Sequence, residues 1–246
     1  MTSNLAESQW LLILFCGILI GMSKTGLSGA GLFVVPVFAA IFGGKPSVGL
    51  VLPMLIVADI FAVKYYSRHA EWKFILKLLP WAFAGVLIAF FVGKSINDDQ
   101  FRKLIAYVVL SGIGLMIFQD VRKQKLNPPD YWWLAALLGL AGGFATMIGN
   151  AAGPILSLYL LSMRLPKNIY IGTGAWFFFI INLSKVPFHV FFWKTITIES
   201  LKLNAIMILP IMVGAVGGFY LVKIIPEKTY RWFIIISTLA SSIALF

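Results

Sequence analysis

Two glycine-rich stretches decide how this chain folds: Gly21-Met-Ser-Lys-Thr-Gly-Leu-Ser-Gly-Ala-Gly31 and Gly143-Phe-Ala-Thr-Met-Ile-Gly-Asn-Ala-Ala-Gly-Pro154. Each stretch separates two apolar runs and combines helix-breaking residues with polar side chains. Non-helical backbone at membrane depth is tolerated only where it lines a cavity or is buried in protein, because its polar groups need partners. The two stretches therefore predict interrupted helices around an internal polar site.

The rest of the chain is apolar enough to face lipid. Hydrophobic residues make up 60% of the 246 positions and charged residues 12%, which is about half the charged share of a soluble domain. The apolar runs are continuous rather than alternating, and several approach the ~20 residues of a spanning helix. We expect an all-α integral membrane protein in a lipid bilayer. Its ten apolar segments lie near residues 10–22, 27–42, 48–66, 74–92, 104–118, 132–148, 151–163, 169–192, 201–222 and 230–246.

The net charge of +11 does not indicate a nucleic-acid partner. The basic residues sit in short loops between apolar runs rather than in one patch, as the positive-inside rule produces. One set of alternate loops holds about twice as many Lys and Arg as the other, so we expect that face to be cytoplasmic and both termini to lie outside. Cys16 is the single cysteine, which excludes an intrachain disulfide and a cysteine-based metal site.

The two halves of the chain resemble each other. Glycines recur at matching places around both polar stretches, and a charged pattern that includes Lys94 and Arg102 recurs at Lys223 and Arg231. Residues 1–126 and 127–246 therefore form two predicted transmembrane repeats of about five helical segments each, within one membrane domain. Because the halves enter from opposite faces, the repeat is inverted, a construction shared by many secondary transporters.

The first two segments of each half are short. A run of ~14–16 residues rises only about 21–24 Å, less than the ~30 Å hydrocarbon core. The sequence leaves two topologies open: ten crossings, or six crossings with two re-entrant hairpins. The halves have opposite orientations in either case.

The polar stretches carry the candidate binding groups. A helix follows each one, and its free N–H groups and positive dipole end suit an anion. Lys24 would be costly in hydrocarbon, by about 2.5 kcal/mol or more, without a partner or a watery cavity. Thr25, Ser23 and Ser28 offer hydroxyl donors, and Asn150 offers an amide. The alternative is that Lys24 lies in an interfacial loop, where the glycines only permit close helix packing.

Four further polar residues fall within apolar runs. Asn182 and Lys185 are three apart on one helix face and either line the cavity or serve helix packing. Asp59, the only carboxylate inside a predicted segment, pairs with Lys24 or with Lys64 in a structural ion pair, or it carries a coupling proton. His189 lies near a helix end and is a proton carrier or an interfacial histidine.

The Gly21–Gly31 turn, the Asn150–Pro154 turn and the Leu165–Gly174 stretch resemble the TauE/SafE family of sulfite exporters over nearly the whole chain. The resemblance implies a carrier of sulfite, a sulfonate or a related organosulfur anion in the bacterial cytoplasmic membrane. It also implies that binding residues come from both signatures. These are Lys24, Thr25, Gly26, Ser28, Gly29 and Gly31 in the first half, and Asn150, Gly153, Pro154, Asn182 and Lys185 in the second.

We therefore predict a secondary transporter, an exporter of a small sulfur-containing anion that works by alternating access at a midplane site. We expect it to have no cofactor, no metal and no catalytic residues. The sequence leaves open whether it forms a homo-oligomer. Other functions remain as alternatives: a carrier of a different small anion or metabolite, a cation or metal carrier, an intramembrane enzyme and a structural membrane protein. The enzyme is disfavoured because the sequence has only two histidines, His69 and His189, and no cluster with ligand spacing.

Overall fold

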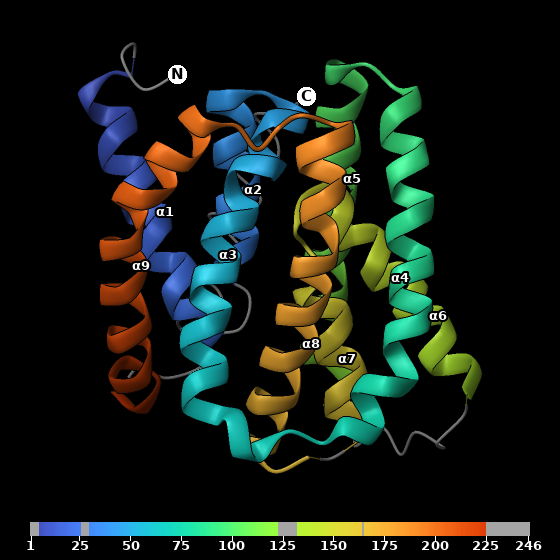
Figure 1. Ribbon diagram of the computed structural model, residues 1–246. Helices are drawn as coiled ribbons and strands as arrows, with labels where there is room; N and C mark the ends of the chain where they lie inside the picture. Colours follow the sequence, from blue (N-terminus) through green and yellow to red (C-terminus); the bar gives the residue numbers. More distant parts are fainter. Residues whose placement is uncertain (1–4, 26–29, 123–131, 164, 225–246) are drawn as a thin grey trace.

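The computed structural model describes residues 5–25, 30–122, 132–163 and 165–224, and all regular elements within these ranges are helices. Figure 1 shows them packed as one bundle, with α3 and α8 between the pair α1–α9 and the pair α4–α6. In chain order the elements are α1 (Glu7–Thr25), α2 (Ala30–Phe42), α3 (Gly44–Tyr66), η1 (Ser67–His69), α4 (Trp72–Ser95), α5 (Asp98–Arg122), α6 (Trp132–Gly149), α7 (Gly153–Ser162), α8 (Lys167–Pro187), η2 (Phe188–Phe192) and α9 (Ile198–Ile224).

The helices agree with nine of the ten predicted segments, and the tenth, residues 230–246, lies outside the described residues. The first segment of each half is longer than predicted, because α1 has 19 residues and α6 has 18. Within the described residues, six helical stretches are long and apolar enough to cross a membrane: Glu7–Thr25, Gly44–Tyr66, Trp72–Ser95, Trp132–Gly149, Asn168–Phe192 and Ile198–Tyr220. The all-helical membrane architecture is confirmed.

The second helix of each half is short. α2 has 13 residues and α7 has 10, so they rise only ~20 and ~15 Å, and neither reaches across a ~30 Å hydrocarbon core. In Figure 1, α2 returns toward the end of the molecule where α1 begins, and α7 returns toward the opposite end, where α6 begins. Two helical hairpins thus enter the bundle from opposite ends. Their inner ends, residues 24–25 and 30–31 of the first hairpin and residues 149–153 of the second, are called the tips and lie inside the bundle.

Glycines allow the two outer helix pairs to approach closely. A Cβ on Gly21 of α1 would overlap the backbone of α9 at Ile211, and a Cβ on Gly143 of α6 would overlap the backbone of α4 at Ala82. Gly21 and Gly143 occupy matching positions in the alignment of the two halves, and Ile211 and Ala82 match as well. The same contact is therefore made twice by matching residues. The inverted repeat remains a prediction, and a duplication would produce this correspondence.

Two apolar clusters fill the bundle. One joins α2 and the start of α3 to α4, α5, α6, α7 and α8, and the other joins α1, α2 and α3 to α9. α2 and α3 contribute to both clusters, so the tip of the first hairpin is held between them. Large apolar side chains cover much of the outer surface, among them Leu11, Trp132, Phe191 and Ile198, each at least 70% exposed. A surface of this kind suits lipid rather than water.

Candidate functional site

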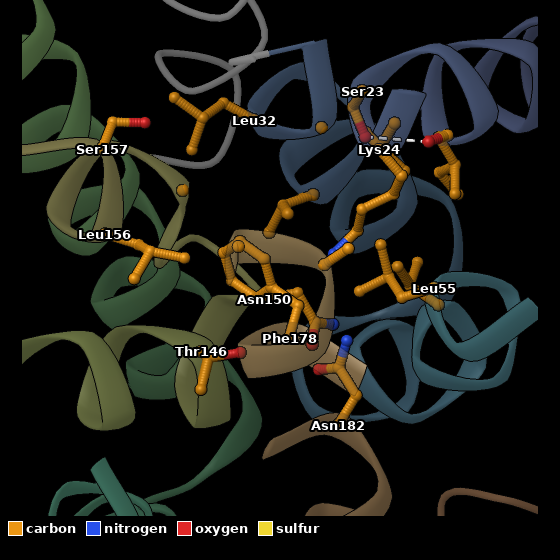
Figure 2. A pocket seen from close by; sticks show the side chains of 18 of the residues that line it. Ser23, Lys24, Leu32, Leu55, Thr146, Asn150, Leu156, Ser157, Phe178 and Asn182 are labelled. Atoms are coloured by element: carbon orange, nitrogen blue, oxygen red, sulfur yellow. Dashed lines mark hydrogen bonds between the residues drawn. The ribbon is translucent and has the colours of Figure 1, made fainter. Parts of the chain in front are cut away.

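A cavity of about 100 Å³ lies where the two hairpin tips meet. By this measure a water needs roughly 10–15 Å³, so the cavity has room for a group of several heavy atoms. Its walls come from α1, α2, α3, α6, α7 and α8. Figure 2 shows Lys24 and Ser23 on one side of it, Thr146 and Asn150 on another, and Asn182 beside them.

Local hydrogen bonds shape the end of α1. The hydroxyl of Thr25 donates to the carbonyl of Gly21 at 3.2 Å, and the hydroxyl of Ser23 donates to the carbonyl of Ile20 at 2.8 Å. Serine and threonine commonly return such bonds to the preceding turn. They leave the Lys24 side chain, between the two hydroxyls in sequence, directed into the cavity.

The second tip turns at Asn150. Its φ is 52°, in the left-handed region, which asparagine adopts more readily than other non-glycine residues. The turn ends α6 at Gly149, and α7 begins at Gly153. Asn150 and Gly153 thereby reach the cavity wall, and the first backbone N–H groups of α7 lie beside it.

Lys24 is held by an ion pair inside the bundle. Its ammonium lies 2.8 Å from Asp59 Oδ1, and the two side chains are 11% and 0% exposed. The ammonium also lies over the ring of Phe178, 3.9 Å from its centroid, a favourable cation–π position. Asp59 Oδ2 accepts a hydrogen bond from Asn182 Nδ2 at 2.6 Å. This chain of contacts joins the first tip to the middle of α3 and of α8.

Lys185 holds the second tip. It is fully buried, and its ammonium donates to the carbonyl and hydroxyl oxygens of Thr146 at 3.0 and 2.9 Å and to Asn150 Oδ1 at 2.7 Å. An ammonium has three protons, and these three oxygens match them. The amide nitrogen of Asn150 donates in turn to the carbonyl of Val48 at 3.2 Å. The second tip is therefore tied to α8 and α3 by neutral oxygens rather than by an ion pair.

The structure brings some of the predicted site residues together and leaves others apart. Lys24, Gly31, Asn150, Gly153 and Asn182 line the cavity. Gly26, Ser28 and Gly29 lie outside the described residues.

Three other predicted binding residues do not line the cavity. The Thr25 hydroxyl is bonded to its own helix, Pro154 faces Gly112 of α5, and Lys185 has its protons occupied by the second tip. For these three, binding remains a prediction that the geometry does not favour.

The two predicted proton carriers also lie behind the cavity wall. Asp59 contacts the wall residues Lys24 and Asn182. His189 is fully buried in the π-helical turn η2 and hydrogen-bonds through Nδ1 to Thr195 Oγ1 at 2.8 Å. It is buried inside the protein rather than exposed on its surface. Among the described residues, no group of three His, Cys, Asp or Glu side chains could hold a metal ion.

Sequence reasoning assigned no binding role to several wall residues: Thr146, Ser157, Tyr170 and Phe178. Tyr170 donates to the Ser157 hydroxyl at 2.8 Å, which joins α8 to α7. Phe178 could have been found, because it lies four residues before Asn182 and hence on the same helix face. The sequence carries no comparable signal for Ser157 or Tyr170.

Comparison with known proteins adds one finding. The family model described as "Sulfite exporter TauE/SafE" matches residues 13–245. No curated protein and no solved structure gave a significant match to the chain.

Proposed function

The chain belongs to the TauE/SafE family of sulfite exporters, and from that premise we propose that it carries a small sulfur-containing anion, such as sulfite or an organosulfonate, out of the cell. The anion would bind in the cavity between the hairpin tips. The protein would act as a secondary transporter in the cell membrane, with its N-terminus outside and without a catalytic step.

The observation that carries this proposal is the position of Lys24. Its ammonium is the one charged group that lines the cavity among the described residues, and its side chain remains 11% exposed although it is ion-paired. Asn150, whose amide nitrogen donates one proton to the Val48 carbonyl, retains a second N–H for a ligand. The start of α7 adds backbone N–H groups beside the same space. A cation with neutral donors inside an apolar bundle favours an anion over a cation.

Alternating access would follow from the hairpins. Each hairpin enters from one end of the bundle and ends at the cavity, so tilting one hairpin opens a path to one end only. We propose that the two ends open in turn around a site that stays near the midplane, as in carriers built from inverted repeats.

The membrane potential would supply a driving force for export, at about 2.3 kcal/mol per charge per 100 mV, since a negative interior expels anions. If protons are coupled, Asp59 is the better placed of the two predicted carriers. It contacts the wall residues Lys24 and Asn182, whereas His189 contacts Thr195 and Trp193.

The test is efflux of radiolabelled sulfite from liposomes that contain the purified protein. We expect saturable efflux that an inside-negative potential accelerates and that Lys24→Ala reduces at least tenfold. Lys94→Ala is the matched control, because Lys94 is an exposed lysine at the end of α4, and it should leave efflux unchanged.

A panel of competing anions distinguishes a sulfur-anion carrier from a carrier of a different small anion or metabolite. Inhibition of efflux by sulfonates but not by chloride, phosphate or acetate would support a sulfur-anion carrier. No sulfite efflux, with competition by another class of anion, would assign the same cavity to a different small anion or metabolite.

A further inference from the structure

Asn182, one of the residues that line the cavity, carries a buried hydrogen-bond acceptor that has no partner among the described residues. From it we infer, on the basis of the proposed function, that Asn182 selects anions that also carry an O–H or N–H donor, such as hydrogensulfite or a hydroxy- or aminosulfonate. Asn182 would thus determine specificity, while Lys24 provides the attraction for the negative charge.

The orientation of the Asn182 amide is fixed by its neighbour. Its nitrogen donates to Asp59 Oδ2 at 2.6 Å, and an ionised carboxylate only accepts hydrogen bonds. A flipped amide would bring its oxygen against the carboxylate oxygen. Asp59 in turn is held by Lys24 at 2.8 Å, so the whole arrangement resists rotation. Figure 2 shows the amide nitrogen of Asn182 turned toward the Lys24 side chain and the amide oxygen turned away from it.

The amide oxygen is left without a partner. Asn182 is 1% exposed and lines the cavity. Its Oδ1 is buried and has no hydrogen bond within the part of the chain that the structure describes. A buried acceptor that lacks its hydrogen bond is unfavourable, and a ligand that supplies a donor recovers that free energy. Because the oxygen is the negative end of the amide dipole, an oxyanion cannot direct a bare oxygen toward it.

The hydroxyl groups in the same wall do not impose this requirement. Ser157 accepts from Tyr170 and keeps its own O–H proton for an anion, and Ser23 can donate to an anion if its hydroxyl rotates away from the Ile20 carbonyl. Each hydroxyl can also accept from a donor. The carbonyl oxygen of Asn182 can only accept. It is therefore the wall group that distinguishes an anion with a donor from one without.

Two sulfonates of equal charge test the inference: ethanesulfonate and 2-hydroxyethanesulfonate, which differ by one hydroxyl. Their dissociation constants are measured by calorimetry on the full chain in lipid nanodiscs. We expect the hydroxylated anion to bind the wild type about 5- to 150-fold more tightly, the equivalent of about 1–3 kcal/mol for a satisfied buried acceptor. In Asn182→Val the two constants should agree within about twofold.

Two control variants identify the residue responsible. Asn204→Val removes another buried asparagine, whose amide oxygen likewise has no partner among the described residues. Asn204 does not line the cavity, and the variant should keep the wild-type preference. Ser157→Ala removes the alternative acceptor on α7 and should also keep it.

Equal affinities in the wild type, or a preference lost in Ser157→Ala and kept in Asn182→Val, would overturn the role of Asn182 and leave the anion carrier intact. Binding of neither sulfonate, together with no sulfite efflux, would overturn the proposed function and this inference with it.

Discussion

Replacement of Lys24 by methionine removes the cation that neutralises Asp59. The two charges are 2.8 Å apart, and Asp59 is fully buried. At an effective dielectric constant of about 20, their attraction at that distance is about 6 kcal/mol. Part of it offsets the cost of taking both charges out of water, so the net loss on breaking a buried pair is about 3–5 kcal/mol.

Neutralising both partners should recover most of that loss. In the double variant Lys24→Met, Asp59→Asn no buried charge is left alone, and a pair replaced by neutral groups of similar volume is often close to neutral in stability. We expect the double variant to be at least about 2 kcal/mol more stable than Lys24→Met alone.

Thermal unfolding in detergent, followed by tryptophan fluorescence, measures these differences. For a chain of this size 1 kcal/mol corresponds to about 2–4 °C in Tm, so Lys24→Met should unfold roughly 6–20 °C below the wild type. The double variant should unfold close to the wild type. Lys94→Met at an exposed position should leave Tm unchanged. A double variant as unstable as the single one would refute the ion pair as the reason for the loss.

Three other regions give separate predictions. Asp98 accepts hydrogen bonds from two backbone N–H groups at the start of α3, both at 3.0 Å. In the same unfolding assay, Asp98→Ala should lower stability by about 1–2 kcal/mol. Asp99→Ala, at an exposed position, should lower it by less than about 0.5 kcal/mol. Gly143→Ala forces a Cβ into the backbone of α4 and should cost about 1–3 kcal/mol or more, whereas Gly114→Ala has open space and should be neutral or stabilising. In a cysteine-free background, single cysteines at positions 99 and 168 should react with an impermeant thiol reagent from opposite faces of the membrane, and labelling from one face would contradict hairpins that enter from opposite ends.

The sequence predicted the parts of the fold that follow from local patterns. Continuous apolar runs predicted the helices, and Gly–Pro interruptions at positions 149–154 predicted the break between α6 and α7. The pairing of Lys24 with Asp59 was one of the alternatives left open, because the one carboxylate inside a predicted apolar segment has few candidate cations. Charge complementarity in an apolar interior is a strong constraint, and it can be seen without coordinates.

The contacts within the candidate site depend on distances between helices, which a pattern along one segment does not contain. Asn182 and Lys185 share a helix face, yet Asn182 lines the cavity and Lys185 binds the oxygens of Thr146 and Asn150 behind it. Spacing along one helix does not determine how deep each side chain lies in the bundle. Ser157 lines the cavity because α7 packs against α8. Only the packed structure shows which hydroxyl group of α7 faces the cavity.

Counterflow of radiolabelled sulfite tests the central claim most directly. Liposomes that contain the protein and are loaded with unlabelled sulfite are diluted into a trace of labelled sulfite, and the label inside is followed with time. A carrier that alternates between two faces exchanges internal for external anion, so the label should accumulate transiently above its external concentration in the wild type and fail to do so in Lys24→Ala. Label that only equilibrates, at the same rate in both proteins, would contradict an anion carrier with Lys24 in its site.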